Sequence, residues 1–171
     1  MTRNRSHGTG RFSPGELARL GADVVLEEDV RIWHPETVEL GDGVYVGHGT
    51  MLKGYYRSRM VIGAGTWIGQ MCFLHSAGGI WIGENVGIGP GVRIVTSQHR
   101  LDQTDRPILH SDLLFAAVRI EAGADIGVGA ILLPGSTIRS GAQVAAGAVV
   151  NGEVDAFSVV AGVPARPLRT R

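Results

Sequence analysis

The sequence predicts an all-β protein built as a stack of about six triangular coils of short parallel strands, and three features indicate this fold class. Aliphatic residues recur at every sixth position. A small or β-branched residue follows most of them four positions later. Glycine, which makes up 26 of the 171 residues, often comes directly after the aliphatic residue. Neither a helical period nor a simple alternation of apolar and polar residues produces these three columns together.

The aliphatic column gives each element of this fold its place. Each hexapeptide supplies one strand and one corner, three of them close a triangle, and the triangles stack at the strand spacing of about 4.8 Å. The aliphatic side chains fill the interior, which one coil can bury only against its neighbours. The column consists of Leu20, Leu26, Ile32; Leu40, Val46, Leu52; Ile62, Ile68, Leu74; Ile82, Ile88, Ile94; Ile120, Ile126, Leu132; and Ile138, Val144, Val150.

The second, small-residue column runs from Val24 to Val154 and also faces the interior. Cys72, which is the only cysteine, belongs to this column. A buried free cysteine behaves as a small hydrophobic residue. We therefore interpret Cys72 as structural, and direct acyl transfer is favoured over an acyl-enzyme on this thiol.

The six-residue spacing lengthens four times, after Ile32, Leu52, Leu74 and Ile94, by two, four, two and 20 residues. Every insertion follows the third strand of a coil, so all four should emerge from one corner of the prism. Loops on a rigid scaffold usually carry function. The sequence therefore predicts a functional site at this corner.

Four ring-bearing residues fall at the same corner: His75, His99, Tyr55 and Tyr56. His75 follows the third aliphatic residue of its coil, and His99 opens the longest insertion. The register places His75 one coil below Val95, which is four residues before His99. We therefore expect the two imidazoles to lie near one another.

The N-terminal segment, residues 1–19, contains the sequence Ser13-Pro14-Gly15-Glu16, which is typical of a helix start with a capping box. A short helix near 14–20 should therefore cover the open end of the prism. The prism itself is expected over 20–160, with a projecting loop over 95–119. Residues 161–171 form a C-terminal tail.

Composition excludes several classes of partner. Sixteen basic and 16 acidic residues give a net charge of zero, which provides no attraction for nucleic acid or an anionic membrane. The apolar runs are far shorter than the roughly 20 residues that span a bilayer. No apolar segment follows the basic N-terminus, so a secretory signal is not indicated. We expect a cytoplasmic protein with no membrane partner.

The segment IGENVGIGPGVRIVTSQHRLDQTDRPI, followed later by ILLPGSTIRSGAQVAAGAVV and VVAGVPARPLR, resembles the hexapeptide-repeat acyltransferases, in particular the maltose, galactoside and polysaccharide O-acetyltransferases. The resemblance covers about residues 40–171. It implies a left-handed parallel β-helix and an acetyl-CoA-dependent O-acetyltransferase. The acceptor would be a hydroxyl of a sugar or another small molecule. It also implies a homotrimer with the CoA cleft between subunits, and no metal.

The resemblance assigns His99 as the catalytic base, because a histidine stands at the root of the family's projecting loop. A neutral imidazole suits this role at physiological pH. His75 is the second candidate, either as a site group or as a corner residue bonded to the backbone. Asp102 and Asp105 would orient an imidazole or, as loop carboxylates usually are, be solvated.

The resemblance also implies a set of cofactor-binding positions. One small residue meets the pantetheine through its backbone, another position lies beside the cofactor, and two tail arginines lie near the nucleotide phosphates. An Asn-Gly pair stands where the family has Thr-Lys. These positions are Ala146, Val128, Arg166 and Arg169, and Asn151 with Gly152.

Three other functions compete with this interpretation. A γ-class carbonic anhydrase holds zinc with three histidines, but His75, His99 and His110 are separated by 24 and 11 residues and include no short pair. A non-catalytic β-helix scaffold would keep the fold without the chemistry. An amino-sugar N-acyltransferase is the alternative within the transferases, since these residues do not separate amine from hydroxyl acceptors.

The remaining histidines and the tryptophans receive structural interpretations. We expect His110 to be solvated, and His7, His34 and His48 to lie on the surface. The three tryptophans stand next to turn positions, so their side chains should face outward and favour a subunit interface. They are Trp33, Trp67 and Trp81.

Overall fold

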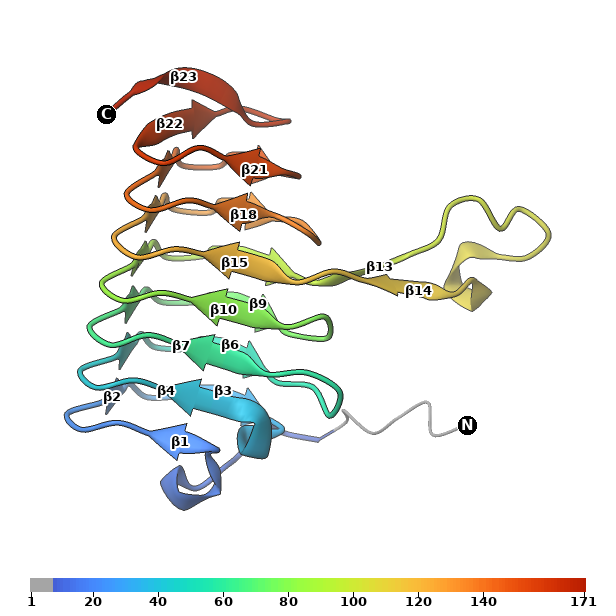
Figure 1. The fold of residues 1–171 in the computed structure, drawn as a ribbon. Coiled ribbons are helices and arrows are strands. Elements are labelled where there is room, and N and C mark those ends of the chain that lie inside the picture. Colours follow the sequence, from blue (N-terminus) through green and yellow to red (C-terminus); the bar gives the residue numbers. More distant parts are fainter. Residues whose placement is uncertain (1–7) are drawn as a thin grey trace.

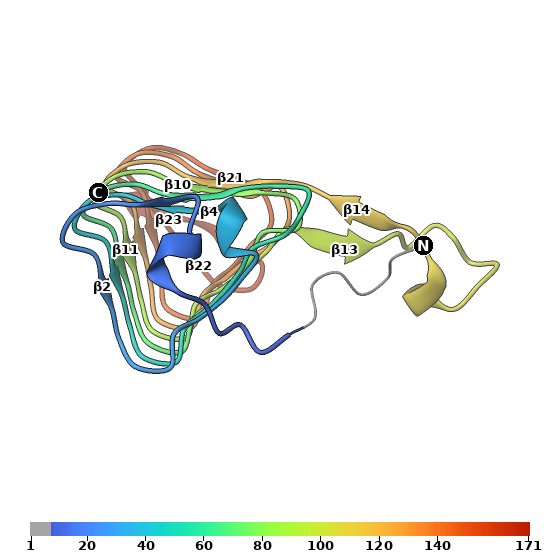
Figure 2. The same ribbon diagram turned by 90° about the horizontal axis from the view of Figure 1, so that it is seen from below.

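The computed structural model describes residues 8–171, which form a three-sided prism of stacked parallel strands with a hairpin projecting from one side (Figures 1 and 2). His7 lies outside the described residues. The chain winds upward from the N-terminal end in a left-handed sense (Figure 1). We name the three sides faces A, B and C in the order in which the chain meets them, and each corner by the two faces that it joins.

Each face is a ladder in which strands of successive coils pair in register. Face A contains β1 (Arg19–Leu20), β4 (Val38–Leu40), β7 (Met60–Ile62), β10 (Ile80–Ile82), β15 (Val118–Ile120), β18 (Thr137–Ile138) and β21 (Glu153–Val154). Face B contains β2 (Val25–Leu26), β5 (Tyr45–Val46), β8 (Trp67–Ile68), β11 (Gly87–Ile88), β16 (Asp125–Ile126), β19 (Gln143–Val144), β22 (Ser158–Ala161) and β23 (Arg166–Thr170). Face C contains β3 (Arg31–Trp33), β6 (Met51–Lys53), β9 (Phe73–His75), β12 (Arg93–Val95), β17 (Ile131–Leu132) and β20 (Val149–Val150).

The interior of the prism is the aliphatic column that the six-residue spacing predicts. Ile68, Leu74 and Ile88 are fully buried, and the register stacks Ile68 directly on Ile88. The small-residue column fills the corners of the interior, where Cys72 is fully buried. Its hydroxyl members replace lost water contacts: Thr50 Oγ1 donates to the Gly69 carbonyl at 2.8 Å.

The glycines after the aliphatic residues let the coils stack closely. A Cβ on Gly127 would lie 2.5 Å from the backbone nitrogen of Ala146 in the next coil. That distance is far inside van der Waals contact, so a side chain here would push the coils apart. The turn itself is made two residues later in the corner, where Gly129 adopts a φ of 67°.

The N-terminal cap is shorter than the sequence predicts. The helix expected near 14–20 is a single 3₁₀ turn, η1 (Pro14–Glu16), although the Glu16 carboxylate does accept the capping-box bond from the Ser13 backbone at 2.5 Å. Residues 19 and 20 are extended and pair with β4. One isolated helical turn is unfavourable, so pairing with β4 prevails. Leu17 instead covers the end of the core, and Leu20, which has no coil beneath it, is 41% exposed.

At the C-terminal end the prism continues beyond the six predicted coils. Val154 is not a member of the small-residue column, because it stacks on Ile138 in face A. The spacing from Val150 to Val154 is four residues rather than six, since the corner between them contains only a short turn. Face B then continues with β22, and the tail folds back as β23, antiparallel to β22.

All four insertions emerge from the CA corner, as the sequence predicts. The first contains η2 (Pro35–Thr37), the second a turn closed by a bridge between Tyr55 and Ser58, and the third a tight turn after β9. The fourth forms an antiparallel hairpin of β13 (Ser97–His99) and β14 (Leu113–Phe115), which carries η3 (Ile108–His110) beyond it. The two views agree that the hairpin extends away from the prism (Figures 1 and 2).

Candidate active site

His99 ends β13 on the projecting hairpin, opposite Leu113 of β14. Its Nδ1 lies 3.2 Å from the Ser111 carbonyl oxygen. A carbonyl can only accept, so Nδ1 carries the proton of the neutral imidazole in this bond. Nε2 is then left with a free lone pair. This bond fixes both the tautomer and the direction of the ring, which are the two properties that a general base requires.

The segment that supplies the carbonyl is itself held in place. Ser111 is buried, and its hydroxyl donates to the Ile108 carbonyl at 2.7 Å. The next residue, Asp112, exchanges two hydrogen bonds with the Gln103 side chain, at 2.7 and 2.8 Å. The loop beyond β13 and β14 is therefore closed by polar contacts between Gln103 and Asp112.

Asp102 and Asp105 do not orient an imidazole. Asp102 pairs with Arg100, and the Asp105 carboxylate accepts hydrogen bonds from Arg106 at 2.7 and 3.0 Å. These pairs lower the pKa of both carboxyl groups and place them on the exposed loop. The interpretation of these groups as solvated loop carboxylates fits the structure.

His75 lies on face C, between Lys53 one coil below and Val95 one coil above, as the register predicts. Its ring stacks on Phe73, with 6.1 Å between centroids, and meets the edge of Tyr55 at 6.0 Å. Burial, assisted by the charge of Lys53, lowers the pKa of His75, so the ring is neutral at physiological pH. Burial also raises the pKa of Tyr55.

The two imidazoles do not form a pair. The chain passes from Val95, next to His75, into a hairpin that runs away from the prism, and four extended residues span about 13 Å. No hydrogen bond or ring contact connects His75 with His99. The two rings make no direct contact, because β13 turns outward instead of following face C.

Two of the predicted cofactor positions stack on the BC corner. Val128 and Ala146 occupy equivalent places in consecutive coils, joined by the bond from the Gly147 backbone to the Val128 carbonyl at 2.8 Å. Both residues are exposed. Neither of their backbone N–H groups donates to another described residue. This corner therefore presents two free donors, a feature that fits an amide-bearing chain such as pantetheine.

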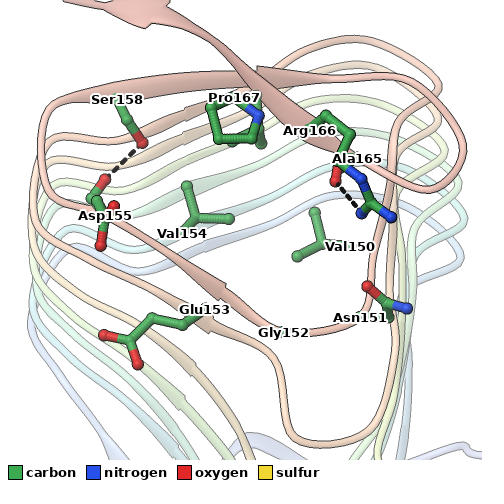
Figure 3. Close-up of a pocket in the computed structure, with 11 residues that line it drawn as sticks. Val150, Asn151, Gly152, Glu153, Val154, Asp155, Ser158, Ala165, Arg166 and Pro167 are labelled. Carbon is green, nitrogen blue, oxygen red and sulfur yellow. Dashed lines mark hydrogen bonds between the residues drawn. The ribbon is translucent and has the colours of Figure 1, made fainter.

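Asn151 and Arg166 meet at the C-terminal end of the prism, around a cavity of about 210 Å³ (Figure 3). The apolar floor is formed by Val150, Val154 and Val160. Arg166 folds back on the Ala165 carbonyl at 3.0 Å, which leaves most of its donors unused. Arg169 also lies on β23, where it faces Val159 and is exposed outside this cavity.

The predicted site residues are thus divided among three places in one chain. His99 projects from the CA corner, Val128 and Ala146 lie on the BC corner, and the tail arginines lie at the C-terminal end. Asn151 belongs to the CA corner but sits two coils above the hairpin. In a single copy of the chain, the predicted base and the predicted pantetheine positions therefore lie on different corners.

Other chemistries find less support in the described residues. Burial raises the pKa of the Cys72 thiol, which is unsuitable for a nucleophile. Over residues 8–171, no group of three or more His, Cys, Asp or Glu side chains could hold a metal ion. Within the same range, no helix is long and apolar enough to span a membrane.

One residue near the site escaped the sequence interpretation. Phe115 of β14 packs against Tyr55, with 6.4 Å between centroids, and the Arg57 guanidinium lies 5.1 Å from its ring. The signal was present in the sequence, since Phe115 is the only phenylalanine, tyrosine or tryptophan in the long insertion. Its partner could not be identified without the path of the hairpin.

None of the known family models matches the chain. Two curated proteins named as acetyltransferases are similar to it. One, from Schizosaccharomyces pombe, is 40% identical over 91 residues, which cover 53% of this chain and 42% of that protein. The other, from Mycobacterium tuberculosis, is 28% identical over 134 residues, covering 78% and 44%. The chain spans less than half the length of these relatives.

Solved structures are similar over nearly the whole chain. A hexapeptide-repeat acetyltransferase from Vibrio cholerae, 26% identical, matches with a TM-score of 0.68 over 91% of this chain and 75% of its own. The N-acyltransferase AntD from Bacillus cereus, 20% identical, gives 0.83 over 95% and 92%. A maltose O-acetyltransferase from Clostridium difficile, 23% identical, gives 0.63 over 91% and 71%.

The chain has the fold of the hexapeptide-repeat acyltransferases. The predicted left-handed parallel β-helix and the predicted resemblance are both confirmed. The Vibrio protein has been solved with acetyl-coenzyme A, and AntD with coenzyme A and dTDP. The structures similar to this chain therefore include both an O-acetyltransferase and an N-acyltransferase.

Proposed function

We propose that this chain is an acyl-CoA-dependent acyltransferase that moves an acetyl group from CoA to a hydroxyl of a sugar-like acceptor. The similar proteins that carry a functional name are acetyltransferases or acyltransferases, and two of the solved ones hold CoA or acetyl-CoA. A maltose O-acetyltransferase and a dTDP-bound enzyme among them support a sugar-like acceptor.

The observation that carries the proposal is the bond from His99 Nδ1 to the Ser111 carbonyl. It leaves Nε2 as a hydrogen-bond acceptor on an exposed hairpin, where an acceptor molecule can approach. In direct transfer, Nε2 takes the hydroxyl proton while the acceptor oxygen bonds to the thioester carbonyl carbon. The carbon–sulfur bond then breaks, and the imidazolium returns the proton to the departing thiolate.

His75 does not share this role in the proposed reaction. It is packed between Phe73 and Tyr55, and its burial lowers its pKa. A ring packed between two others is poorly placed to reach the hydroxyl of a bound acceptor. We assign the base to His99 alone.

The residues present fit CoA as the second substrate. The free N–H groups of Val128 and Ala146 suit the amide carbonyls of pantetheine. Arg166 and Arg169 suit the phosphates, because guanidinium groups form charge-assisted bonds to anionic oxygens. Asn151 lies next to Arg166 in the terminal cavity and can supply a neutral amide contact. Gly152 has no side chain to offer where the family has lysine.

We further propose that the working form is a homotrimer with each site between two subunits. The base and the cofactor positions lie on different corners of one prism, and a neighbouring copy would bring its hairpin to the next copy's BC corner. The hairpin loop carries exposed apolar side chains that suit such contact. They are Leu101, Ile108, Leu109, Leu113 and Leu114.

The test is an acceptor screen with CoA thiol release as readout, run on wild type and on His99→Ala. His99 lies outside the core, so its removal should leave the fold and the CoA Michaelis constant nearly unchanged. Turnover should fall by about 10²–10⁴, the usual value of general-base assistance. A variant that keeps more than about a tenth of wild-type turnover would place the base elsewhere.

The same screen separates the two acceptor classes, because matched sugars bearing a hydroxyl or an amine at the same carbon compete for one site. Faster transfer to the amine would replace the O-acetyltransferase by an N-acyltransferase. If neither acceptor gives thiol release although the protein still binds CoA, the result would support a non-catalytic scaffold.

Subunit sharing is tested by mixing His99→Ala with Ala146→Trp, a variant whose indole should obstruct the BC corner. If each site joins a hairpin from one copy to a corner from another, an equal mixture regains about a quarter of wild-type activity. A site contained in one chain would regain none.

A further inference from the structure

The contact between the prism and the catalytic hairpin suggests a role for a residue far from the reacting atoms. The two hairpin strands are only three residues long each, and Phe115 pairs with Ser97, two positions before His99. A small rotation of the hairpin about its root would therefore move the His99 ring. Something must fix that rotation if Nε2 is to meet an acceptor in a defined geometry.

The root of the hairpin is bound to the turn after β9. The Ala116 backbone donates to the Thr96 carbonyl at 3.0 Å, and Thr96 Oγ1 donates to the His75 carbonyl at 2.7 Å. Gly78 donates to the same hydroxyl at 2.8 Å. These bonds hold the root of the hairpin at Thr96. They do not fix the orientation of β13 and β14, which lie further along the hairpin.

The side-chain contact comes from the preceding insertion. Tyr55 lies with its edge against the His75 ring, at 6.0 Å and 86°, and also contacts Phe115 at 6.4 Å. Arg57 from the same turn lies over the Phe115 ring at 5.1 Å. Tyr55 therefore bridges the prism and β14.

The turn that carries Tyr55 is rigid enough to act as an anchor. Its backbone is closed by the Ser58 N–H, which donates to the Tyr55 carbonyl at 3.1 Å. The Ser58 hydroxyl donates to the Ser76 carbonyl in the turn of the next coil. Tyr55 also packs against Tyr56, with 4.7 Å between ring centroids.

We propose that Tyr55, held by His75, is a positioning residue that clamps Phe115 and so fixes the catalytic hairpin in the orientation that aims His99. The inference rests on the proposed function of His99. It assigns His75 to the support of Tyr55. Aromatic pairs of this kind contribute beyond the area that they bury and are directional, so an aliphatic side chain cannot replace them.

The experiment compares Tyr55→Leu, Tyr55→Phe and the matched control Tyr45→Leu, which removes a tyrosine from face B, where Tyr45 stacks on Trp67 rather than near the hairpin. Tyr55→Leu should lower kcat by about 10- to 100-fold, because misplacement by about 1 Å has costs of this order. The Michaelis constant for CoA should not change. Tyr55→Phe keeps the ring contacts and should retain wild-type turnover. Tyr45→Leu should also have the wild-type kcat.

Hydrogen–deuterium exchange provides the readout that does not depend on activity. In Tyr55→Leu the amides of β13 and β14 should exchange faster, while those of β9 and β12 keep wild-type rates. Phe115→Leu breaks the same contact from the hairpin side and should reproduce the faster exchange. It keeps the test decisive if Tyr55→Leu folds poorly. Unchanged hairpin exchange in both variants would overturn the clamp. Absence of acyl transfer in wild type would instead count against the proposed function, with the exchange result still deciding the clamp.

Discussion

The prism and the hairpin are built on opposite principles. In the prism, the aliphatic side chains of the inner coils are buried by the coils above and below, and Ile88 is fully buried. In the hairpin loop, Leu101 and Leu109 are 76% and 75% exposed. The loop is held instead by a few polar bonds and by Phe115 at its root. Stability therefore resides in the repeat, and the proposed chemistry in the segment that interrupts it.

The largest difference between the two regions should appear in the effect of truncation on stability. Ile88→Ala should lower the free energy of unfolding by about 2–5 kcal/mol, since it removes a fully buried side chain from a stack that cannot collapse. Leu109→Ala should change it by less than about 0.5 kcal/mol, because an exposed side chain buries little area. Urea unfolding followed by circular dichroism measures both. Equal losses would mean that the loop is packed in the assembled protein.

The sequence predicted the prism well because its signal is repeated. Each aliphatic position is supported by those six residues before and after it, so the register did not depend on any single residue. The errors fall at the ends: Leu20 has no neighbouring coil beneath it, and Val154 follows a shortened corner. There the repeat provides only one neighbour to fix the register.

The hairpin was predictable as an insertion but not as a structure. The strand around His99 is the tripeptide Ser-Gln-His, which has no apolar alternation, and its partner strand begins 14 positions after His99. The pairing depends on tertiary contacts that the sequence does not repeat.

In contrast, the six-residue register could have predicted that the proposed site residues lie on two different corners. Val128 and Ala146 follow the second aliphatic residue of a coil, whereas every insertion follows the third.

The second prediction concerns the BC corner, which belongs to the prism but carries two of the proposed cofactor positions. Gly127→Ala would place a Cβ 2.5 Å from the Ala146 nitrogen, a backbone atom that cannot move without displacing its coil. Overpacking of this kind typically costs about 1–3 kcal/mol. The shift should also disturb the free N–H of Ala146, so the Michaelis constant for CoA should rise. Thermal unfolding and steady-state kinetics measure the two effects.

Gly15→Ala, in the N-terminal turn η1, provides the matched control. A Cβ at Gly15 would meet nothing within 4 Å. This variant should therefore keep both the wild-type melting temperature and the wild-type Michaelis constant. If Gly127→Ala behaved in the same way, the close stacking at the BC corner would not constrain the coils.

The smallest predicted effect lies where the two regions meet, at His75. Burial lowers the pKa of His75 in the folded protein below the value of about 6.5 that it has when unfolded. The unfolded chain therefore binds a proton at a higher pH than the folded chain does. The contribution of His75 to stability should be fully present above about pH 6.5, decline as the pH falls below 6.5, and stop declining once the pH is below the pKa of His75 in the folded protein.

The variant His75→Gln has no titrating group at this position, so its melting temperature should depend less on pH in this interval. Should His75→Gln keep the wild-type slope, the His75 ring would be free to take up its proton in the folded protein, and the packing between Phe73 and Tyr55 would be looser than the ring contacts indicate.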